Sequence, residues 1–310
     1  MTAADQTPKG PMQPKAAVVD ARAAAISVGA LAVGMTLASA TPVLVAGASL
    51  EGLAVSLWRL WIPAVVFAAI TAGRHRHSWT LLRLTARAGI CFGGATALYF
   101  SAVQLTSVAN ATLITVMQPL PLVIAARFMF SERIGVPDLG WIALALGGAT
   151  VMVLSADSGG TADIRGDLIA AGATVVSAGY FIFGKRARAT LDTDVFMTGL
   201  LFWAGLTIAP IALISGQDVV PPDGEEWLRM TALGFIVGFG HMFINFANGR
   251  LPLAVLGVFQ LFVPVGAALM AWAFLDQSIT TGQGVGIAVV VIALTSHTRY
   301  SARMRAAAPA

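Results

Sequence analysis

The chain has 310 residues, of which 57% are hydrophobic and 11% are charged; its mean hydropathy is +0.80 and its formal net charge is +4. A soluble domain carries about 25% charged residues, so this chain cannot cover itself with a water-soluble surface. Its apolar runs are about 18–24 residues long, which suits a helix crossing a bilayer core of ~30 Å. The ~10-residue alternating segments of a β-barrel are not visible. The composition therefore predicts an all-α integral membrane protein.

Residues 1–22 contain several prolines and no apolar periodicity, and we expect them to form a disordered cytoplasmic tail. The next apolar run, residues 23–46, is too long for the apolar region of a secretory signal peptide and is followed by further spans. The single cysteine, Cys91, excludes an intrachain disulfide and suggests no metal cluster.

Ten runs are predicted to cross the membrane, with ends good to a few residues. They lie at about 24–46, 50–72, 87–104, 108–130, 138–155, 167–184, 195–215, 228–248, 252–275 and 280–298. Residues 23–156 form a first five-helix unit and residues 157–298 a second, followed by a cytoplasmic tail at 299–310. The connections are too short to hold a soluble catalytic or nucleotide-binding domain.

The basic residues predict the orientation of these spans. Sixteen of the nineteen Lys and Arg residues fall on the side of the N-terminus, only Arg165 and Arg229 fall on the opposite side, and Arg59 lies within a span. The protein is therefore expected in the inner membrane of the cell, with both termini in the cytoplasm. The high isoelectric point follows from this asymmetry, so a nucleic-acid partner is not expected; the expected partners are the lipid bilayer and a small-molecule substrate, with the protein a monomer or homodimer.

The two units share an order of features. A shift of 144 residues places Gly94 on Gly238, Phe130 on Phe274, Glu132 on Asp276 and Gly140 on Gly284, while Pro119 and Pro264 fall one residue out of step. Each unit has five spans, an odd number, so the units must face opposite ways across the membrane. Inverted repeats of this kind place a binding site near the midplane and support alternating access. We expect spans three, four, eight and nine to contribute much of the cavity wall.

The Ser131-Glu132-Arg133 turn after a proline-bearing fourth span, the glycine-rich fifth span, Arg59 in the second span and the ten-span layout together resemble the drug/metabolite transporter superfamily, EamA type. The resemblance covers residues 24–298. It implies export or exchange of small metabolites such as amino acids. The sequence departs from the family pattern at Asp276, where the second copy usually has Glu, and at residues 251–257.

Polar and aromatic residues within spans are the candidates for contact with substrate, because polar groups there are costly and usually face the interior of the bundle. Arg59 is the only full charge well inside a span; it could hold a substrate carboxylate, or it could be bonded to helix-end carbonyls. Interhelical hydrogen bonding is an equal alternative for the polar residues of the eighth span. The predicted substrate-binding residues are Arg59, Tyr99, Trp203, His241, Asn245 and Gln260. If transport is coupled to protons, His241 is the group expected to carry the proton.

Prolines and acidic turns predict the mechanical elements. A proline removes a backbone donor and weakens the helix around it, and hinges at matching places in both units suit a rocking cycle. The predicted gate and hinge residues are Pro119, Pro121, Glu132, Pro264 and Asp276. The pairs Gly89/Gly93 and Gly234/Gly238 are expected to allow close helix packing.

Motifs for other classes of protein are missing from the sequence. It has no Walker loop, no metal-spaced His/Cys cluster and no Ser-His-Asp set, so no cofactor and no catalytic residue are expected. The alternatives to a transporter are a membrane-embedded enzyme, which would need such groups, and a channel-like facilitator, which would need a filter motif or a ring of charges.

Overall fold

The computed structural model describes residues 21–46, 48–72, 79–156 and 163–306, and these residues form α-helices and no strand. The tail predicted at residues 1–22 lies almost wholly outside the described residues. The helices are α1 (Ala21–Ser39), α2 (Thr41–Ala46), α3 (Gly52–Ala72), α4 (Trp79–Leu105), α5 (Val108–Val116), α6 (Pro119–Met129), α7 (Val136–Leu154), α8 (Ile164–Arg188), α9 (Thr193–Ile214), α10 (Gly224–Asn248), α11 (Leu253–Gln260), α12 (Phe262–Phe274) and α13 (Thr281–Ala306).

Ten candidate membrane spans lie within the described residues, as the sequence predicts. Three of them are built from two helices each: α1 with α2, α5 with α6, and α11 with α12. The third and sixth spans are longer than predicted, at Leu81–Leu105 and Ile164–Arg188. The apolar runs underestimate them because the helices continue into basic turns, as in α8, whose last turn holds Lys185, Arg186 and Arg188.

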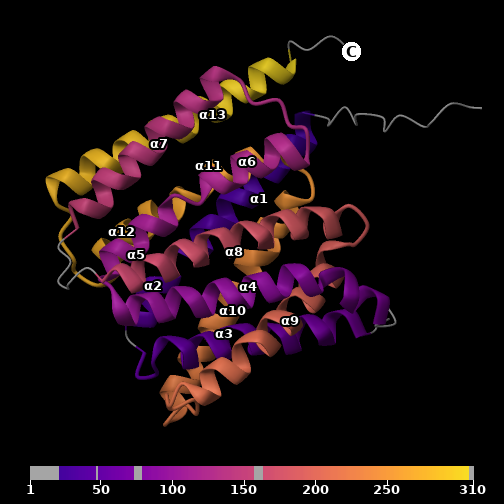
Figure 1. Ribbon diagram of the computed structural model, residues 1–310, viewed down its shortest axis with the longest axis vertical. Helices are drawn as coiled ribbons and strands as arrows, with labels where there is room; N and C mark the ends of the chain where they lie inside the picture. Colours follow the sequence, from indigo (N-terminus) through magenta and orange to yellow (C-terminus); the bar gives the residue numbers. More distant parts are fainter. Residues whose placement is uncertain (1–20, 47, 73–78, 157–162, 307–310) are drawn as a thin grey trace, which may run out of the picture.

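The helices pack mainly across the two five-helix units. α4 packs against α8 and α9, α10 packs against α1 and α3, and the pairs α7/α13, α6/α11 and α3/α9 each join one helix from each unit. Exchanging the two units turns α4/α8 and α4/α9 into α10/α1 and α10/α3 and leaves α7/α13 and α3/α9 as they are, whereas α6/α11 has no counterpart of similar extent among the described residues. Figure 1 shows α7 and α13 running side by side along one flank, and it places the start of α1 and the end of α13 at the same end of the bundle. We call that end the terminal face and the other end the opposite face.

The structure corrects the register of the repeat from 144 to 145 residues. A shift of 145 carries the start of α4 onto the start of α10, α5 onto α11 and α7 onto α13. Pro119 then coincides with Pro264, and the unusual positive φ of Ser131, 53°, coincides with that of Asp276, also 53°. The structural counterpart of Glu132 is therefore Gln277 rather than Asp276: the backbone N–H groups of both residues return to the sixth residue before them, Ala126 and Ala271.

The prolines divide two spans at matching places. α5 ends at Val116 and α6 begins at Pro119, while α11 ends at Gln260 and α12 begins two residues before Pro264. Neither Pro119 nor Pro264 has an N–H group to continue the helical ladder, and each lies in the first turn of the second helix of its span. The side chain of Gln118, at the first break, donates to Ser177 Oγ of α8 over 2.8 Å. The first break is thus supported by a neighbouring helix, as buried irregular backbone requires.

The two glycine pairs allow helices of opposite units to approach closely. An added Cβ at Gly89 or Gly93 of α4 would lie 2.5 Å from α9, on Trp203 Cβ and the Ala204 carbonyl oxygen respectively. On α10, a Cβ at Gly238 would lie 2.5 Å from Pro63 Cβ of α3. Small residues are needed where backbones meet in this way, so both pairs hold the units together.

Candidate substrate-binding site

One face of α4 builds the first wall of the site. Phe92, Thr96 and Phe100 follow one another at intervals of four residues, which places them on the same face of the helix. Arg59 of α3 reaches this face: its Nη2 donates to Thr96 Oγ1 over 3.4 Å, and its Cζ lies 5.6 Å from the centroid of the Phe100 ring. Thr96 Oγ1 itself donates to the Phe92 carbonyl over 2.9 Å, so the hydroxyl is held in place to accept from Arg59.

Arg59 has unused binding capacity. Its Nε is buried and lacks a hydrogen-bond partner, and among the described residues no carboxylate forms an ion pair with it. A guanidinium carries five N–H donors in a planar fork that matches a carboxylate. A buried charge without an anionic partner is costly, so a bound anion would stabilise Arg59.

A second group of polar and aromatic residues adjoins the first through Phe92. The Phe92 ring lies 4.9 Å from that of Tyr180 on α8 and 4.5 Å from that of His241 on α10. Tyr180 Oη and His241 Nδ1 are 3.2 Å apart, and Asn245 Nδ2 donates to Tyr180 Oη over 2.8 Å. Tyr180 and Asn245 are fully buried, whereas His241 is partly exposed. The side chain that remains open to a ligand is therefore the imidazole.

The corrected register relates the two groups. The residue 145 positions after Thr96 is His241, so α4 and α10 each bring one polar side chain to corresponding points. Arg59 corresponds to Ala204 and has no charged counterpart in the second unit. The site is therefore asymmetric: a cation contacts α4 at Thr96 and Phe100, and an imidazole contacts α4 at Phe92.

The six predicted substrate-binding residues do not all lie in this arrangement. Arg59 and His241 contact the same face of α4, and Asn245 is joined to His241 through Tyr180. Tyr99 packs edge-on against Phe100 at a centroid distance of 5.5 Å. Gln260, partly exposed, is the last residue of α11, at the break in the ninth span. These contacts bring helices of spans two, three, six and eight to the site, whereas the prediction named spans three, four, eight and nine.

Trp203 lies apart from the group. Its Nε1 donates to the Leu82 carbonyl over 2.8 Å, near the start of α4. Leu82 precedes Thr96 by fourteen residues, about 21 Å along the helix. Trp58, the residue 145 positions earlier, donates in the same manner to the Val219 carbonyl. Both indoles anchor one unit to the other.

Besides Tyr180 of α8, three residues of the site, all on α4, were not among the predicted ones: Phe92, Thr96 and Phe100. Their spacing of four along a span that also carries Tyr99 is a signal of one functional face, but phenylalanines at this spacing occur on any buried helix. The contact that distinguishes them comes from Arg59, which no local pattern relates to α4.

Two of the predicted gate residues stand in different environments. Glu132 accepts from the backbone N–H groups of Leu253 and Ala254, at 2.7 and 3.2 Å, and its Oε1 lies 3.5 Å from Lys185 Nζ. It therefore joins the end of span four to the start of span nine and to span six. Asp276 is exposed. Within the described ranges, no group of three or more His, Cys, Asp or Glu side chains could hold a metal ion.

Comparison with known proteins finds a family, a relative and a solved structure that this chain resembles. Residues 164–296 match the EamA-like transporter family. The match lies within the second five-helix unit and covers less than half of the chain. Over 182 residues the chain is 31% identical to the aromatic amino acid exporter YddG of Ancylobacter novellus, a match that covers 56% of this chain and 60% of the relative, less than two thirds of its length. A solved crystal structure is similar to this chain, with a TM-score of 0.75 and 23% sequence identity; the match covers 89% of this chain and 98% of that chain. At this level of identity, the similarity shows that the two chains share a fold.

Proposed function

We propose that this EamA-type protein transports a small organic solute bearing a carboxylate across the membrane and that export is its physiological direction. The observation that carries the proposal is the guanidinium of Arg59, which lies inside a span without a carboxylate partner among the described residues. A substrate carboxylate would supply the missing acceptor and neutralise the charge during passage.

The surroundings of Arg59 favour a substrate that also has an apolar or aromatic part. The Phe100 and Phe92 rings lie on the same face of α4 as the Arg59 contact, and the imidazole of His241 continues the surface. Aromatic rings pair favourably in edge-to-face and offset geometries. The relative that is 31% identical is an exporter of aromatic amino acids, and amino acids of that class are the first substrates to test.

Alternating access between the two units is the proposed mechanism. Two observations support it: helix starts and proline breaks recur at a spacing of 145 residues, and the pairs that α4 forms with α8 and α9 recur as the pairs that α10 forms with α1 and α3. Because each unit has five spans, the second must run opposite to the first across the bilayer. Rocking of one unit against the other would then expose the site to each side in turn.

We further propose that the terminal face is cytoplasmic, because the basic residues concentrate there. Cysteine substitutions in a Cys91→Ser chain test this in intact cells. An impermeant thiol reagent should modify Asp218→Cys, in the connection between α9 and α10, and leave Arg133→Cys, between α6 and α7, unmodified; both native side chains are exposed. The reverse pattern of labelling contradicts the orientation.

Transport by the purified protein in proteoliposomes tests the function. We expect uptake of aromatic amino acids above that of protein-free vesicles, and no uptake of permanent organic cations, which Arg59 repels. An imposed pH gradient should stimulate transport through His241 if protons are coupled, in which case His241→Ala removes the stimulation. Gradient-driven transport that is unchanged in His241→Ala contradicts that coupling route, and robust transport of a cation contradicts the substrate class.

A further inference from the structure

The start of α3 is held by side chains of the other unit. Gln217 Oε1 accepts from the N–H groups of Leu53 and Ala54, at 3.1 and 3.2 Å. Glu226 Oε1 accepts from those of Ser49 and Leu50, at 3.1 and 3.4 Å. Four backbone donors of residues 49–54, which an isolated helix start would leave to water, thus depend on two side chains more than 160 positions away in the sequence. We call Gln217 and Glu226, with the segment they hold, the clasp.

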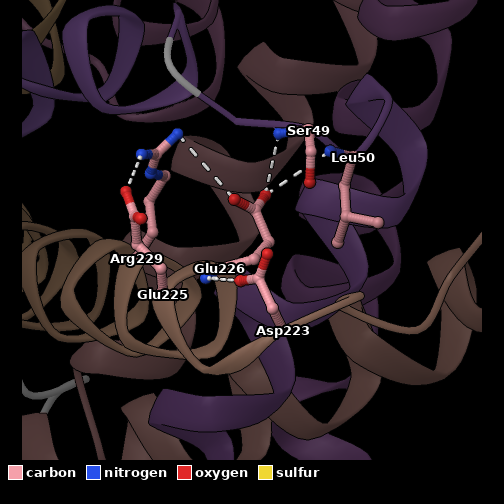
Figure 2. Close-up of polar contacts among 6 residues, drawn as sticks. All are labelled: Ser49, Leu50, Asp223, Glu225, Glu226 and Arg229. Carbon is pink, nitrogen blue, oxygen red and sulfur yellow. Dashed lines mark hydrogen bonds and ion pairs between the residues drawn. The ribbon is translucent and has the colours of Figure 1, made fainter.

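Figure 2 shows Glu226 at the centre of this arrangement. It is only 4% exposed. Its position on the first turn of α10 is set by Asp223, whose Oδ1 accepts from the Glu226 N–H over 2.8 Å. Arg229 Nη1 lies 3.8 Å from Glu226 Oε2, while Arg229 Nη2 donates to Glu225 over 3.1 Å. The carboxylate therefore faces the segment before α3 with one oxygen and a cation with the other.

The clasp continues along α3 to the residue before Arg59. Trp58 donates to the Val219 carbonyl and packs edge-on against Trp227, at a centroid distance of 4.7 Å. A cavity of about 360 Å³ adjoins the clasp, lined by residues that include Ser49, Leu50, Gln217 and Val219. The first two turns of α3 are thus bound to the second unit at three points, with a hollow beside them on the opposite face.

We propose that Glu226 and Gln217 are positioning residues for Arg59 and that the clasp closes the route from Arg59 to the opposite face. The inference rests on the proposed function, in which Arg59 binds the substrate carboxylate. Arg59 follows Ala54 by five residues of continuous helix, about 7.5 Å, so a shift of the helix start moves the guanidinium. Rupture of the clasp lets the first turns of α3 separate from α10 and lets the cavity extend toward Arg59.

Access of water to Ser56 reports this opening. Ser56 is fully buried on α3, and it lies three residues before Arg59, on the same side of the helix. In a chain carrying Cys91→Ser and Ser56→Cys, the rate of modification by a small impermeant thiol reagent measures how often the clasp is open. Glu226→Ala removes both accepted hydrogen bonds, and Glu225→Ala is the matched control, because Glu225 is on the same turn and contacts Arg229 without touching residues 49–54.

We expect Glu226→Ala to raise the modification rate roughly tenfold, equivalent to about 1.4 kcal/mol, and Glu225→Ala to change it less than twofold. Gln217→Ala, in the exposed connection before α10, should also raise the rate, and it serves if Glu226→Ala does not fold. In proteoliposomes, Glu226→Ala should raise KM for an aromatic amino acid several-fold. In each assay, the value for Glu226→Ala is compared with the value for Glu225→Ala.

The two assays separate the clasp from the proposed function. Faster modification of Ser56→Cys in Glu226→Ala and Gln217→Ala supports the clasp even if no aromatic amino acid is transported, a result that would overturn the substrate class alone. Equal modification rates in the parent chain, Glu226→Ala, Gln217→Ala and Glu225→Ala overturn the clasp, whatever the transport assay shows.

Discussion

Replacement of Arg59 by glutamine should lower kcat/KM for a carboxylate-bearing substrate about 100-fold. A hydrogen bond to a charged group contributes about 1.5–3 kcal/mol, and each 1.4 kcal/mol corresponds to a factor of ten. Glutamine keeps a hydrogen-bond donor near Thr96 but loses the positive charge and the paired N–H donors of the guanidinium. Arg59→Lys keeps the charge and loses only the two-pronged geometry, so it should cost about tenfold. Initial rates of uptake into proteoliposomes over a range of substrate concentrations measure both.

Trp203→Phe is the control for this series. It removes one indole hydrogen bond, to the Leu82 carbonyl, about 21 Å along α4 from the Arg59 contact, and should change kcat/KM less than about threefold. An uncharged analogue that lacks both the carboxylate and the amine provides the second comparison, because its transport should not depend on Arg59. Equal losses in Arg59→Gln for the acid and for the uncharged analogue would show that Arg59 supports the fold and does not bind the anion.

The fold could be predicted from the sequence because hydrophobic length is a strong signal in membranes. Ten apolar runs predicted ten spans, and the structure places ten candidate spans in the described residues. The register of the repeat was wrong by one residue. The sequence comparison matched Glu132 with Asp276 because both are acidic. The two units instead share backbone conformation, which makes Ser131 and Asp276, both at φ 53°, the equivalent residues.

The site could be predicted only in part. Arg59 stands out because a charge within a span is rare, but sequence spacing cannot show which residues of the other helices lie near it. Phe92, which contacts Tyr180 and His241, is an ordinary apolar residue in an apolar span, and its role arises from contacts with α8 and α10. Trp203 has the chemistry of a ligand contact, but its indole N–H is already used by the backbone of α4.

The clasp escapes sequence analysis for a related reason. Glu226 falls in an acidic first turn, beside Asp223 and Glu225, where carboxylates commonly stabilise a helix start through the helix dipole. Nothing local separates a residue that caps its own helix from one that caps another. Asp223 does the former, whereas Glu226 binds the backbone of the segment just before α3, and only the packing of α3 against α10 distinguishes them.

Replacement of Gly93 by alanine should destabilise the bundle, whereas the same change at Gly94 should not. The two glycines are neighbours on α4 and gain equally in helix propensity, about 1 kcal/mol for alanine over glycine. A Cβ at Gly93 would lie 2.5 Å from the Ala204 carbonyl oxygen and 2.9 Å from Thr207 Cβ, so α4 and α9 must separate; the nearest atom to a Cβ at Gly94 is Val176 Cγ1, at an ordinary 3.8 Å.

Overpacking typically costs 1–3 kcal/mol and more where backbone must move. We therefore expect Gly93→Ala to lower the Tm in detergent by about 5–10 °C and Gly94→Ala to leave it equal or raise it slightly. Gly238, the residue 145 positions after Gly93, offers an independent check, because its added Cβ would meet Pro63 Cβ of α3 at the same 2.5 Å. If Gly238→Ala and Gly93→Ala both leave Tm unchanged, α4 and α10 do not meet the opposite unit at these glycines. Since Arg59 lies on α3, between Pro63 and the clasp, loosening the Gly238 contact should also weaken substrate binding, which links the packing of the units to the site they enclose.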